Sequence, residues 1–479
     1  MNKTLKSDNS FVKNVLTLMT GTAFAQILPI LASPILTRLY TPEEFGEFGL
    51  FIAILGVISV IGCLRYELAI ALPKEDKDAI NIAALSLIVT AIISSILILC
   101  VIILVFLPEK VVPINNLFPM ILIIPFAVLV TNIYQVLLNW NIRMKNFNKI
   151  SITQIYKSSA VVSGQVGFGF LKSIPSALIL SHFMGQLISV LVLLKSSLNT
   201  LVSNRKHIKI KSIRLQMIKY NKFPKYYSLS ALLNTASVQM PIIMLGIFFN
   251  PVIVGYYTLA NRVLAAPISI IGTAIAQPYL QRATEEHREK KLGDFSFRIF
   301  EKLLALGLVP MILISIVSPE LFIIIFGSKW EVAGVYVQLI SIWLLFVFIS
   351  SPLSHIYTVL ELQKESLNFN AMLFLTRAAV LILGGMYSND FFTILWFGLT
   401  GAVLWFFQII WLLNKAGIKV KLILRTCLQE FIYSVPFIVS PIILRFTIGV
   451  NGMPIIIITA FCLISFFIIK FKVKLYNKK

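Results

Sequence analysis

Long apolar runs with few charges recur along the whole chain, and they restrict its fold more than any other feature. Each run is roughly 20 residues long, the length that an α-helix needs to cross the hydrocarbon core of a membrane. Helices satisfy their own backbone hydrogen bonds in lipid, and the alternating strands of about ten residues that build a membrane barrel are absent. Because 58% of the 479 residues are hydrophobic and 13% are charged, the sequence predicts an all-α polytopic membrane protein.

Fourteen such runs are predicted to be transmembrane helices. They lie at roughly 14–37, 44–64, 79–107, 117–140, 150–170, 174–194, 227–249, 253–278, 300–325, 332–360, 367–387, 390–413, 427–446 and 451–470. The alternate connections that include both termini hold 33 of the 42 Lys and Arg residues, whereas the opposite set holds five. The positive-inside rule therefore predicts cytoplasmic termini. The net charge of +22 is interpreted as a topology signal that also suits anionic lipid headgroups, rather than as a nucleic-acid site.

Two short sequence echoes indicate a duplicated helical unit. Residues 42–46 match 251–255, and residues 133–137 match 356–360 at a slightly different offset. Such repeats build many transporters. The longest basic connection falls where the repeat should break. We therefore expect an N-terminal lobe (1–195, spans one to six), a basic cytoplasmic linker (196–226), a C-terminal lobe (227–413, spans seven to twelve) and an appended helix pair with a basic tail (414–479).

Three cations lie deep within predicted spans and are candidate substrate-binding residues. Lys157 is about 12 Å into the fifth span at about 1.5 Å per residue. Arg262 has a similar depth in the eighth span, and Arg377 is near the middle of the eleventh, with no Asp or Glu at comparable depth in the sequence. A lone intramembrane cation costs at least about 2.5–3.5 kcal/mol. The pattern favours a watery cavity for an anionic ligand, and hydrogen bonding to carbonyls and amides is the alternative.

Four further residues extend this hypothesis. Arg38 and Arg65 lie at span ends, where they either line a cavity mouth or anchor in the headgroups. Arg65 and Glu67 are two residues apart, so they are expected to point to different sides of a helix. His182 and His355 are candidate proton relays within spans, and a structural, hydrogen-bonded histidine is the alternative. The four Cys have no metal-ligand spacing, so no metal site is expected.

The chain also resembles Wzx-type bacterial polysaccharide flippases. The segments that carry the resemblance are 36–46 (LTRLYTPEEFG), 64–73 (LRYELAIALP), 255–267 (GYYTLANRVLAAP), 326–330 (FGSKW) and 350–354 (SSPLS). It covers residues 11 to 413, approximately, and implies the fold of the multidrug/oligosaccharidyl-lipid/polysaccharide (MOP) superfamily: two pseudo-symmetric six-helix lobes around a central cavity. The family's cationic cavity agrees with Lys157, Arg262 and Arg377.

The resemblance further implies a transporter rather than an enzyme. It would move undecaprenyl-diphosphate-linked oligosaccharides across the bacterial cytoplasmic (inner) membrane, by alternating access, for O-antigen or other surface polysaccharide synthesis. The implied partners are this substrate, membrane lipids, and polysaccharide polymerase and chain-length proteins. No cofactor is expected, and coupling to a proton or a sodium gradient is left open.

Three alternative functions stay open at this level. A peptidoglycan lipid-precursor flippase would need similar chemistry. A multidrug antiporter of the same superfamily would use intramembrane acids for cationic drugs, and the sequence has none at depth. A membrane polysaccharide polymerase or glycosyltransferase would be expected to carry a large extramembrane loop, whereas the external connections are short. Residues 75–78 (EDKD) contain a D-x-D pattern, but they open a predicted helix, where acidic residues are favoured.

Overall fold

The computed structural model describes residues 2–106, 118–171, 174–447 and 452–476. These residues form helices and turns, with no strand among them. The chain divides into two compact units, Met1–Gly246 (unit 1) and Ile247–Lys479 (unit 2). The all-α fold class predicted from the sequence is confirmed, and the predicted lobe and linker boundaries stay a prediction. The expected external connections around 107–117 and 172–173 lie outside the described residues.

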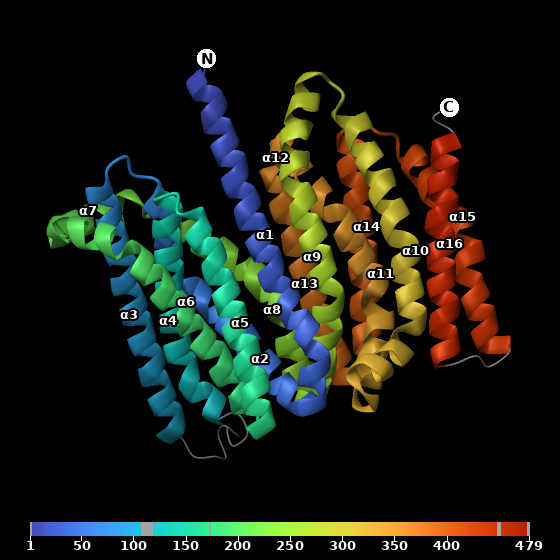
Figure 1. Cartoon of the computed structure of the whole chain (residues 1–479), viewed down its shortest axis with the longest axis horizontal. Helices are drawn as coiled ribbons and strands as arrows, with labels where there is room; N and C mark the ends of the chain where they lie inside the picture. The colour runs from blue at the N-terminus through green and yellow to red at the C-terminus, as the bar shows by residue number, and fades with distance from the viewer. Residues whose placement is uncertain (1, 107–117, 172–173, 448–451, 477–479) are drawn as a thin grey trace. The chain divides into compact units, whose positions relative to one another are not determined.

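Unit 1 is a bundle of long helices joined by short turns (Figure 1). Its elements are α1 (Asn2–Leu39), α2 (Pro42–Gly62), the 3-10 helix η1 (Tyr66–Ala71), α3 (Asp76–Phe106), α4 (Phe118–Arg143), α5 (Phe147–Leu171), α6 (Pro175–Asn204), the 3-10 helix η2 (Arg205–His207), α7 (Ile210–Lys219), the π-helix η3 (Phe223–Tyr227) and most of α8 (Ser228–Phe248). The short helix α7 is turned away from the direction of the long helices in Figure 1. Tyr66 Oη in η1 donates to the Met217 carbonyl of α7 at 3.3 Å, which ties the two segments together.

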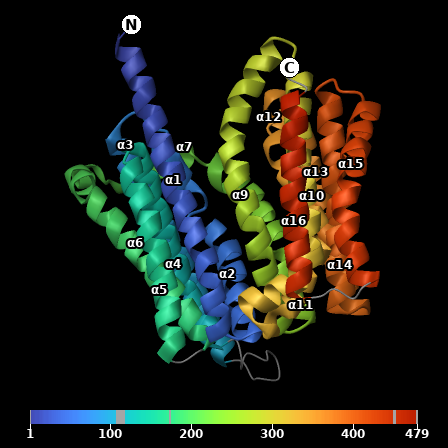
Figure 2. The same ribbon diagram turned by 45° about the vertical axis from the view of Figure 1, so that its right-hand side comes forward.

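Unit 2 is a second bundle of the same kind. Its elements are α9 (Pro251–Arg288), α10 (Leu292–Phe326), the 3-10 helix η4 (Ser328–Trp330), α11 (Glu331–Leu353), α12 (Ile356–Val359), α13 (Gln363–Tyr387), α14 (Asp390–Lys415), α15 (Val420–Thr447) and α16 (Met453–Tyr476). The last two helices pack against each other and against α10. Figure 2 shows that α9 is curved, as expected for a helix that contains Pro267 and Pro278.

Fourteen described helices have at least 21 residues, and each corresponds to one predicted span. Twelve spans are long and apolar enough to cross a membrane within the described residues, and they leave out α5 and α9. In α5 the polar residues Gln154, Lys157 and Gln165 interrupt the apolar sequence. Some helices extend past the predicted limits, because a helix need not end where its apolar run ends. The predicted span 332–360 is divided into α11 and α12 by a turn.

The two units repeat the same local features. Thr41 caps α2 in a capping box with Glu44, and Asn250 caps α9 by accepting from the Ile253 N–H at 3.0 Å. In both helices a proline follows the cap, as in the sequence echo. The contacting helix pairs also correspond, with α2–α4, α3–α4, α4–α6 and α5–α6 in unit 1 and α9–α11, α10–α11, α11–α14 and α13–α14 in unit 2.

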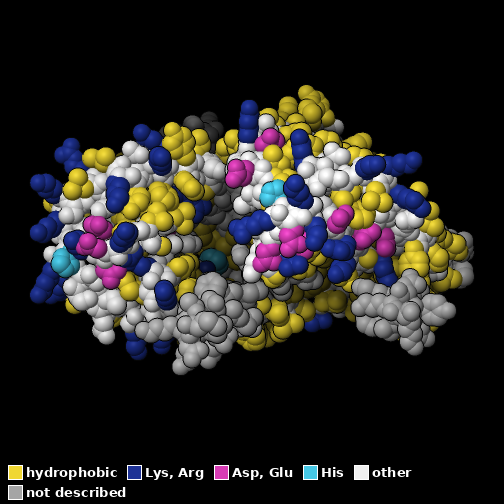
Figure 3. Space-filling model, turned by 90° about the horizontal axis from the view of Figure 1, so that it is seen from above, with side chains coloured by type: hydrophobic (Ala, Val, Ile, Leu, Met, Phe, Trp, Pro, Cys, Tyr) yellow, Lys and Arg dark blue, Asp and Glu magenta, His cyan; other side chains and the backbone are white. Residues whose placement is uncertain are grey.

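The surface of the long helices suits a lipid environment. Ile88, Ile92, Ile96, Leu99 and Ile103 are exposed along one stripe of α3, at helical spacing. A stripe of this kind on a helix of membrane length is expected to face lipid. The face of each unit seen in Figure 3 instead carries many Lys and Arg side chains, as expected for helix ends and connections.

Candidate functional site

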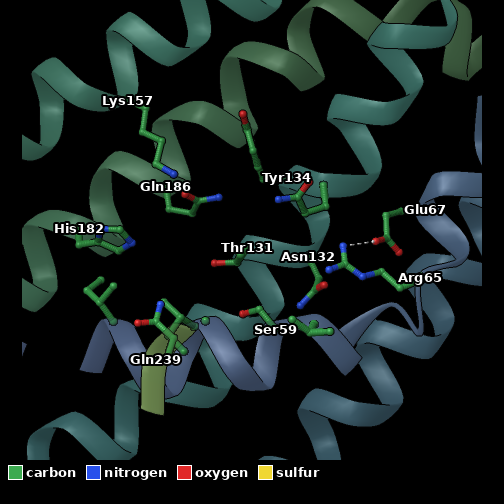
Figure 4. A pocket seen from close by; sticks show the side chains of 15 residues that line it. Ser59, Arg65, Glu67, Thr131, Asn132, Tyr134, Lys157, His182, Gln186 and Gln239 are labelled. Atoms are coloured by element: carbon green, nitrogen blue, oxygen red, sulfur yellow. Dashed lines mark ion pairs between the residues drawn. The ribbon is translucent and has the colours of Figure 1, made fainter. Parts of the chain in front are cut away.

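Unit 1 contains a polar pocket with a volume of about 300 Å³ among its long helices (Figure 4). Side chains from α2, η1, α4, α5, α6 and α8 contribute to it. The polar part of the lining consists of Ser59, Arg65, Glu67, Thr131, Asn132, Tyr134, Gln135, Lys157, His182, Gln186 and Gln239. Because the long helices around it are largely apolar, this lining is suited to holding a polar ligand away from lipid.

The turn after α2 brings Arg65 into the pocket. Leu64 and Arg65 have φ angles of 47° and 59°, in the left-handed region that such residues seldom adopt. Arg65 Nη1 then lies 3.5 Å from Glu67 Oε1. The expectation that these two side chains point to different sides is wrong, because it assumed a continuous α-helix. Glu67 is 4% exposed, and burial raises the pKa of its carboxyl although Arg65 opposes this shift.

Lys157 reaches the pocket from α5. Its ammonium nitrogen lies 5.4 Å from the centroid of the Tyr134 ring on α4, within cation–π range. Tyr134 Oη accepts from Gln154 Nε2 at 2.6 Å, so the ring is held by the same helix that carries Lys157. Gly185 lets α6 approach closely, since a Cβ there would lie 3.0 Å from the Lys157 carbonyl oxygen and 2.3 Å from Val161. No ion pair joins Lys157 to a carboxylate within the part of the chain that the structure describes.

Uncharged polar side chains separate the two cations (Figure 4). Asn132 Nδ2 donates to the Val128 carbonyl at 2.9 Å. A Cβ at Gly62 would lie 2.1 Å from that nitrogen, so the glycine allows α2 to approach α4 here. Four buried atoms of the lining have no hydrogen-bond partner among the described residues: Ser59 Oγ, Arg65 Nε, Glu67 Oε2 and Gln186 Nε2. Buried polar atoms are nearly always paired, so these four are available to a ligand or to water.

The sequence hypothesis identified Arg65, Lys157 and His182 of this pocket and missed its uncharged side chains. His182 presents its ring to Phe48 and Phe51, with centroid separations of 6.1 and 6.5 Å. The uncharged residues are nevertheless visible in the sequence, because they are polar residues inside apolar runs. Which of them face one pocket depends on how six separate segments pack, and the sequence alone does not contain that information.

The other predicted cations lie elsewhere. In unit 2, Arg377 is 8% exposed, and its guanidinium carbon lies 5.4 Å from the Trp343 ring centroid and 5.7 Å from that of Phe397. Arg262 is half-buried on α9 of the same unit. Arg38 is exposed at the end of α1. None of the three lines the pocket described above.

His355 is also separate from the pocket. It lies in the turn between α11 and α12, where its ring centroid is 6.5 Å from that of Tyr279. His182 and His355 therefore belong to different units, and a relay through either one stays a prediction.

Comparisons with known proteins identify the family of the chain. The profile of a family described as polysaccharide biosynthesis protein matches residues 35–334, more than half of the chain. An uncharacterised membrane protein in the cps region of Klebsiella pneumoniae is 23% identical over 244 residues, which are 49% of this chain and 46% of that protein. The match thus spans less than half the length of this curated relative.

Several solved structures share the fold. The lipid II flippase MurJ, in an inward closed conformation, has a TM-score of 0.70 and 13% identity, with 97% of this chain and 99% of that chain covered. An inward-facing multidrug resistance MATE family transporter of the MOP superfamily has a TM-score of 0.63 and 15% identity, with coverage of 82% and 94%. At such low identities these likenesses show the fold alone. The profile match over most of the chain, on a MOP-superfamily fold, shows that this chain belongs to the polysaccharide biosynthesis protein family.

Proposed function

We propose that this protein is a flippase that moves undecaprenyl-diphosphate-linked oligosaccharide repeat units from the cytoplasmic to the outer leaflet of the bacterial cytoplasmic membrane. The product would serve O-antigen or other surface polysaccharide synthesis. The observation that carries the proposal is the pocket of unit 1, where Lys157 faces uncharged polar side chains inside a bundle of membrane-length helices. The family match supports the substrate class.

The chemistry of this substrate suits such a pocket. A diphosphate carries about two negative charges, which need countercharge inside a membrane, and its sugars need a polar path. We propose that Arg262, Arg377 and Arg38 add further countercharge along the route, and that transport proceeds by alternating access through a central cavity. A proton or sodium gradient would supply the driving force, with His182 and His355 as candidate relays. A polysaccharide polymerase and chain-length proteins are the proposed partners.

A peptidoglycan lipid-precursor flippase is the second candidate function. The structural likeness to a lipid II flippase over 97% of the chain favours it. Both substrates would combine a lipid diphosphate with sugars, so the pocket suits either one. Complementation separates them, because only a peptidoglycan-precursor flippase would restore growth to cells depleted of their lipid II flippase.

The test of the leading proposal uses a strain in which this gene is deleted. It should lose surface polysaccharide and accumulate lipid-linked repeat units in the cytoplasmic leaflet, and the wild-type gene should reverse both effects. We expect Lys157→Ala to reduce surface polysaccharide at least ~10-fold while the protein level stays normal. A 10-fold change corresponds to a free-energy difference of about 1.4 kcal/mol. Lys149→Ala, at an exposed position of the same helix, is the matched control and should complement fully. A deletion strain with normal polysaccharide and no accumulated intermediate would refute the proposal.

We also propose that both termini lie in the cytoplasm, as the charge asymmetry of the sequence suggests. A reporter that is active only in the cytoplasm should be active when fused after Lys211 and silent when fused after Asn250. The reverse pattern would overturn this orientation.

A further inference from the structure

The pocket of unit 1 has two chemically different ends, and this difference identifies the part of the substrate that each end recognises. We propose that the Lys157 end holds the phosphate next to the first sugar, and that the Arg65–Glu67 end holds the hydroxyl groups of that sugar. This inference rests on the proposed function and adds to it a set of residues that select the sugar.

The charges of the two ends differ although each has one cation. Arg65 Nη1 lies 3.5 Å from Glu67 Oε1, so the positive charge at this end is compensated. Lys157 has no carboxylate within ion-pair distance in the described part of the chain, and its ammonium lies 5.4 Å from the centroid of the Tyr134 ring. Figure 4 shows Lys157 and Gln186 on one side of the pocket and Arg65 and Glu67 on the other. An anion is therefore attracted to the Lys157 end.

The hydrogen-bonding capacities of the two ends differ in the same direction. Gln186 Nε2 and the Lys157 ammonium are donors, which suits the acceptor oxygens of a phosphate. Glu67 Oε2 is a buried acceptor without a partner among the described residues, and Arg65 Nε is a buried donor in the same situation. The ionised diphosphate of the proposed substrate cannot satisfy an ionised carboxylate, because both groups only accept hydrogen bonds and both are negative. A sugar hydroxyl donates and accepts, so it can satisfy both atoms.

Ser59 supports this assignment from a different element. It lies on α2, and its Oγ is buried without a partner in the described part of the chain. A hydroxyl group both donates and accepts, as the sugar hydroxyls do. Figure 4 shows Ser59 and Asn132 between the two ends. The uncharged part of the pocket thus continues from the carboxylate towards the ammonium, as a sugar attached to a phosphate requires.

The volume of the pocket limits the ligand to a small part of a lipid-linked oligosaccharide. At about 300 Å³ it is at the lower end of the range of roughly 300–1,000 Å³ found for small-molecule sites. It is therefore suited to one sugar and its phosphate, while the lipid and the remaining sugars lie outside. Discrimination would then depend on the sugar that carries the phosphate.

The experiment measures ligand binding by the full chain in lipid nanodiscs, using isothermal titration and thermal shifts. The probes are inorganic phosphate, glucose 1-phosphate, galactose 1-phosphate and N-acetylglucosamine 1-phosphate. We expect wild-type protein to bind at least one sugar phosphate ~10-fold more tightly than inorganic phosphate. Lys157→Gln should weaken all four probes by a similar factor, about 10-fold. Lys149→Gln is the matched control and should change nothing.

Substitutions at the other end should alter selectivity alone. Glu67→Gln and Ser59→Ala should leave the affinity for inorganic phosphate within about 2-fold and reduce the preference for the sugar phosphate by about 5-fold or more. Ser59→Ala removes one hydroxyl group outside the ion pair, so it tests the inference even if Glu67→Gln fails to fold.

Three results would overturn the inference. One is an unchanged phosphate affinity in Lys157→Gln. Another is tighter phosphate binding in Glu67→Gln, which would make Arg65 the anion-binding residue. The third is equal binding of all four probes, or of none, by the wild type. The proposed function is judged separately by polysaccharide export from the deletion strain, so it can survive any of these outcomes.

Discussion

The two units place a cation at corresponding points of a repeated helix arrangement and surround it differently. Lys157 on α5 lies over Tyr134 of α4, and Arg377 on α13 lies over Trp343 of α11, each 5.4 Å from the ring centroid. In unit 2, Phe397 adds a second ring at 5.7 Å, and Arg377 is 8% exposed. In unit 1, Lys157 contacts one aromatic ring among the described residues, and its side chain also lines the pocket.

This difference shows that two cations inside predicted spans can have different surroundings. Both cations lie within predicted spans, Lys157 about 12 Å from the start of its span and Arg377 near the middle of its own. Lys157 borders a space that a ligand can enter, whereas the guanidinium of Arg377 packs beside Trp343 and Phe397, two rings that contact each other with centroids 5.0 Å apart. The comparison therefore predicts that Lys157 affects transport more than stability, and that Arg377 affects stability strongly.

The largest expected effect is on the stability of Arg377→Ala. Removal of this packed side chain leaves a cavity beside the two rings, which should lower the free energy of unfolding by about 2–4 kcal/mol. Lys157→Ala only enlarges an existing pocket, so its effect should stay within about 0.5 kcal/mol. Thermal unfolding of the purified proteins in nanodiscs measures both changes. Equal destabilisation by the two substitutions would contradict the comparison.

Arg377→Met serves as the control for volume. It fills most of the space that the Arg377 side chain occupies beside Trp343 and Phe397, and a neutral side chain needs no countercharge when it is buried. We therefore expect it to recover most of the stability that Arg377→Ala loses. If Arg377→Met is stable and yet blocks export, Arg377 also acts in transport.

A smaller effect is expected from a substitution at Gly185, where α6 closely approaches α5 beside Lys157. A Cβ at Gly185 would lie 2.3 Å from Val161 Cγ2 and 3.0 Å from the Lys157 carbonyl oxygen, so Gly185→Ala must move the Val161 side chain or displace one of the two helices. We expect a loss of about 1–3 kcal/mol and a parallel fall in export, because Lys157 moves with its helix. Gly167→Ala on α5 is the matched control, since its Cβ would meet nothing within 4 Å. An effect of equal size in both variants would exclude the contact as the cause.

The smallest effect concerns pH and compares one carboxyl group in each unit. Burial raises the pKa of Glu67 above 4.5, so its stabilising contribution is present at low pH and is lost as pH rises through the raised value. In unit 2, the hydrogen bond from Lys291 lowers the pKa of Glu289 below 4.5, so its contribution is present at higher pH and is lost as pH falls.

Thermal unfolding between pH 4 and 8, approximately, tests these opposite signs. Relative to wild type, Glu67→Gln should gain stability as pH rises above 4.5. Relative to wild type, Glu289→Gln should lose a little stability as pH rises through the acidic part of the range, because only the wild type gains the contribution of Glu289 there. A shift in the same direction for both variants would show that a property common to both units, rather than burial of Glu67, controls the response.

The sequence by itself determined the helical membrane fold, the fourteen helices and the deep cations, because hydropathy and charge along a span are local properties. Only the tertiary structure decided that Arg65 pairs with Glu67, since two left-handed residues redirect the chain there. It also decided that Lys157 borders a pocket while Arg377 packs beside two aromatic rings. These outcomes depend on which distant helices bring their side chains to one point, and the periodicity of a single helix carries no information about its neighbours.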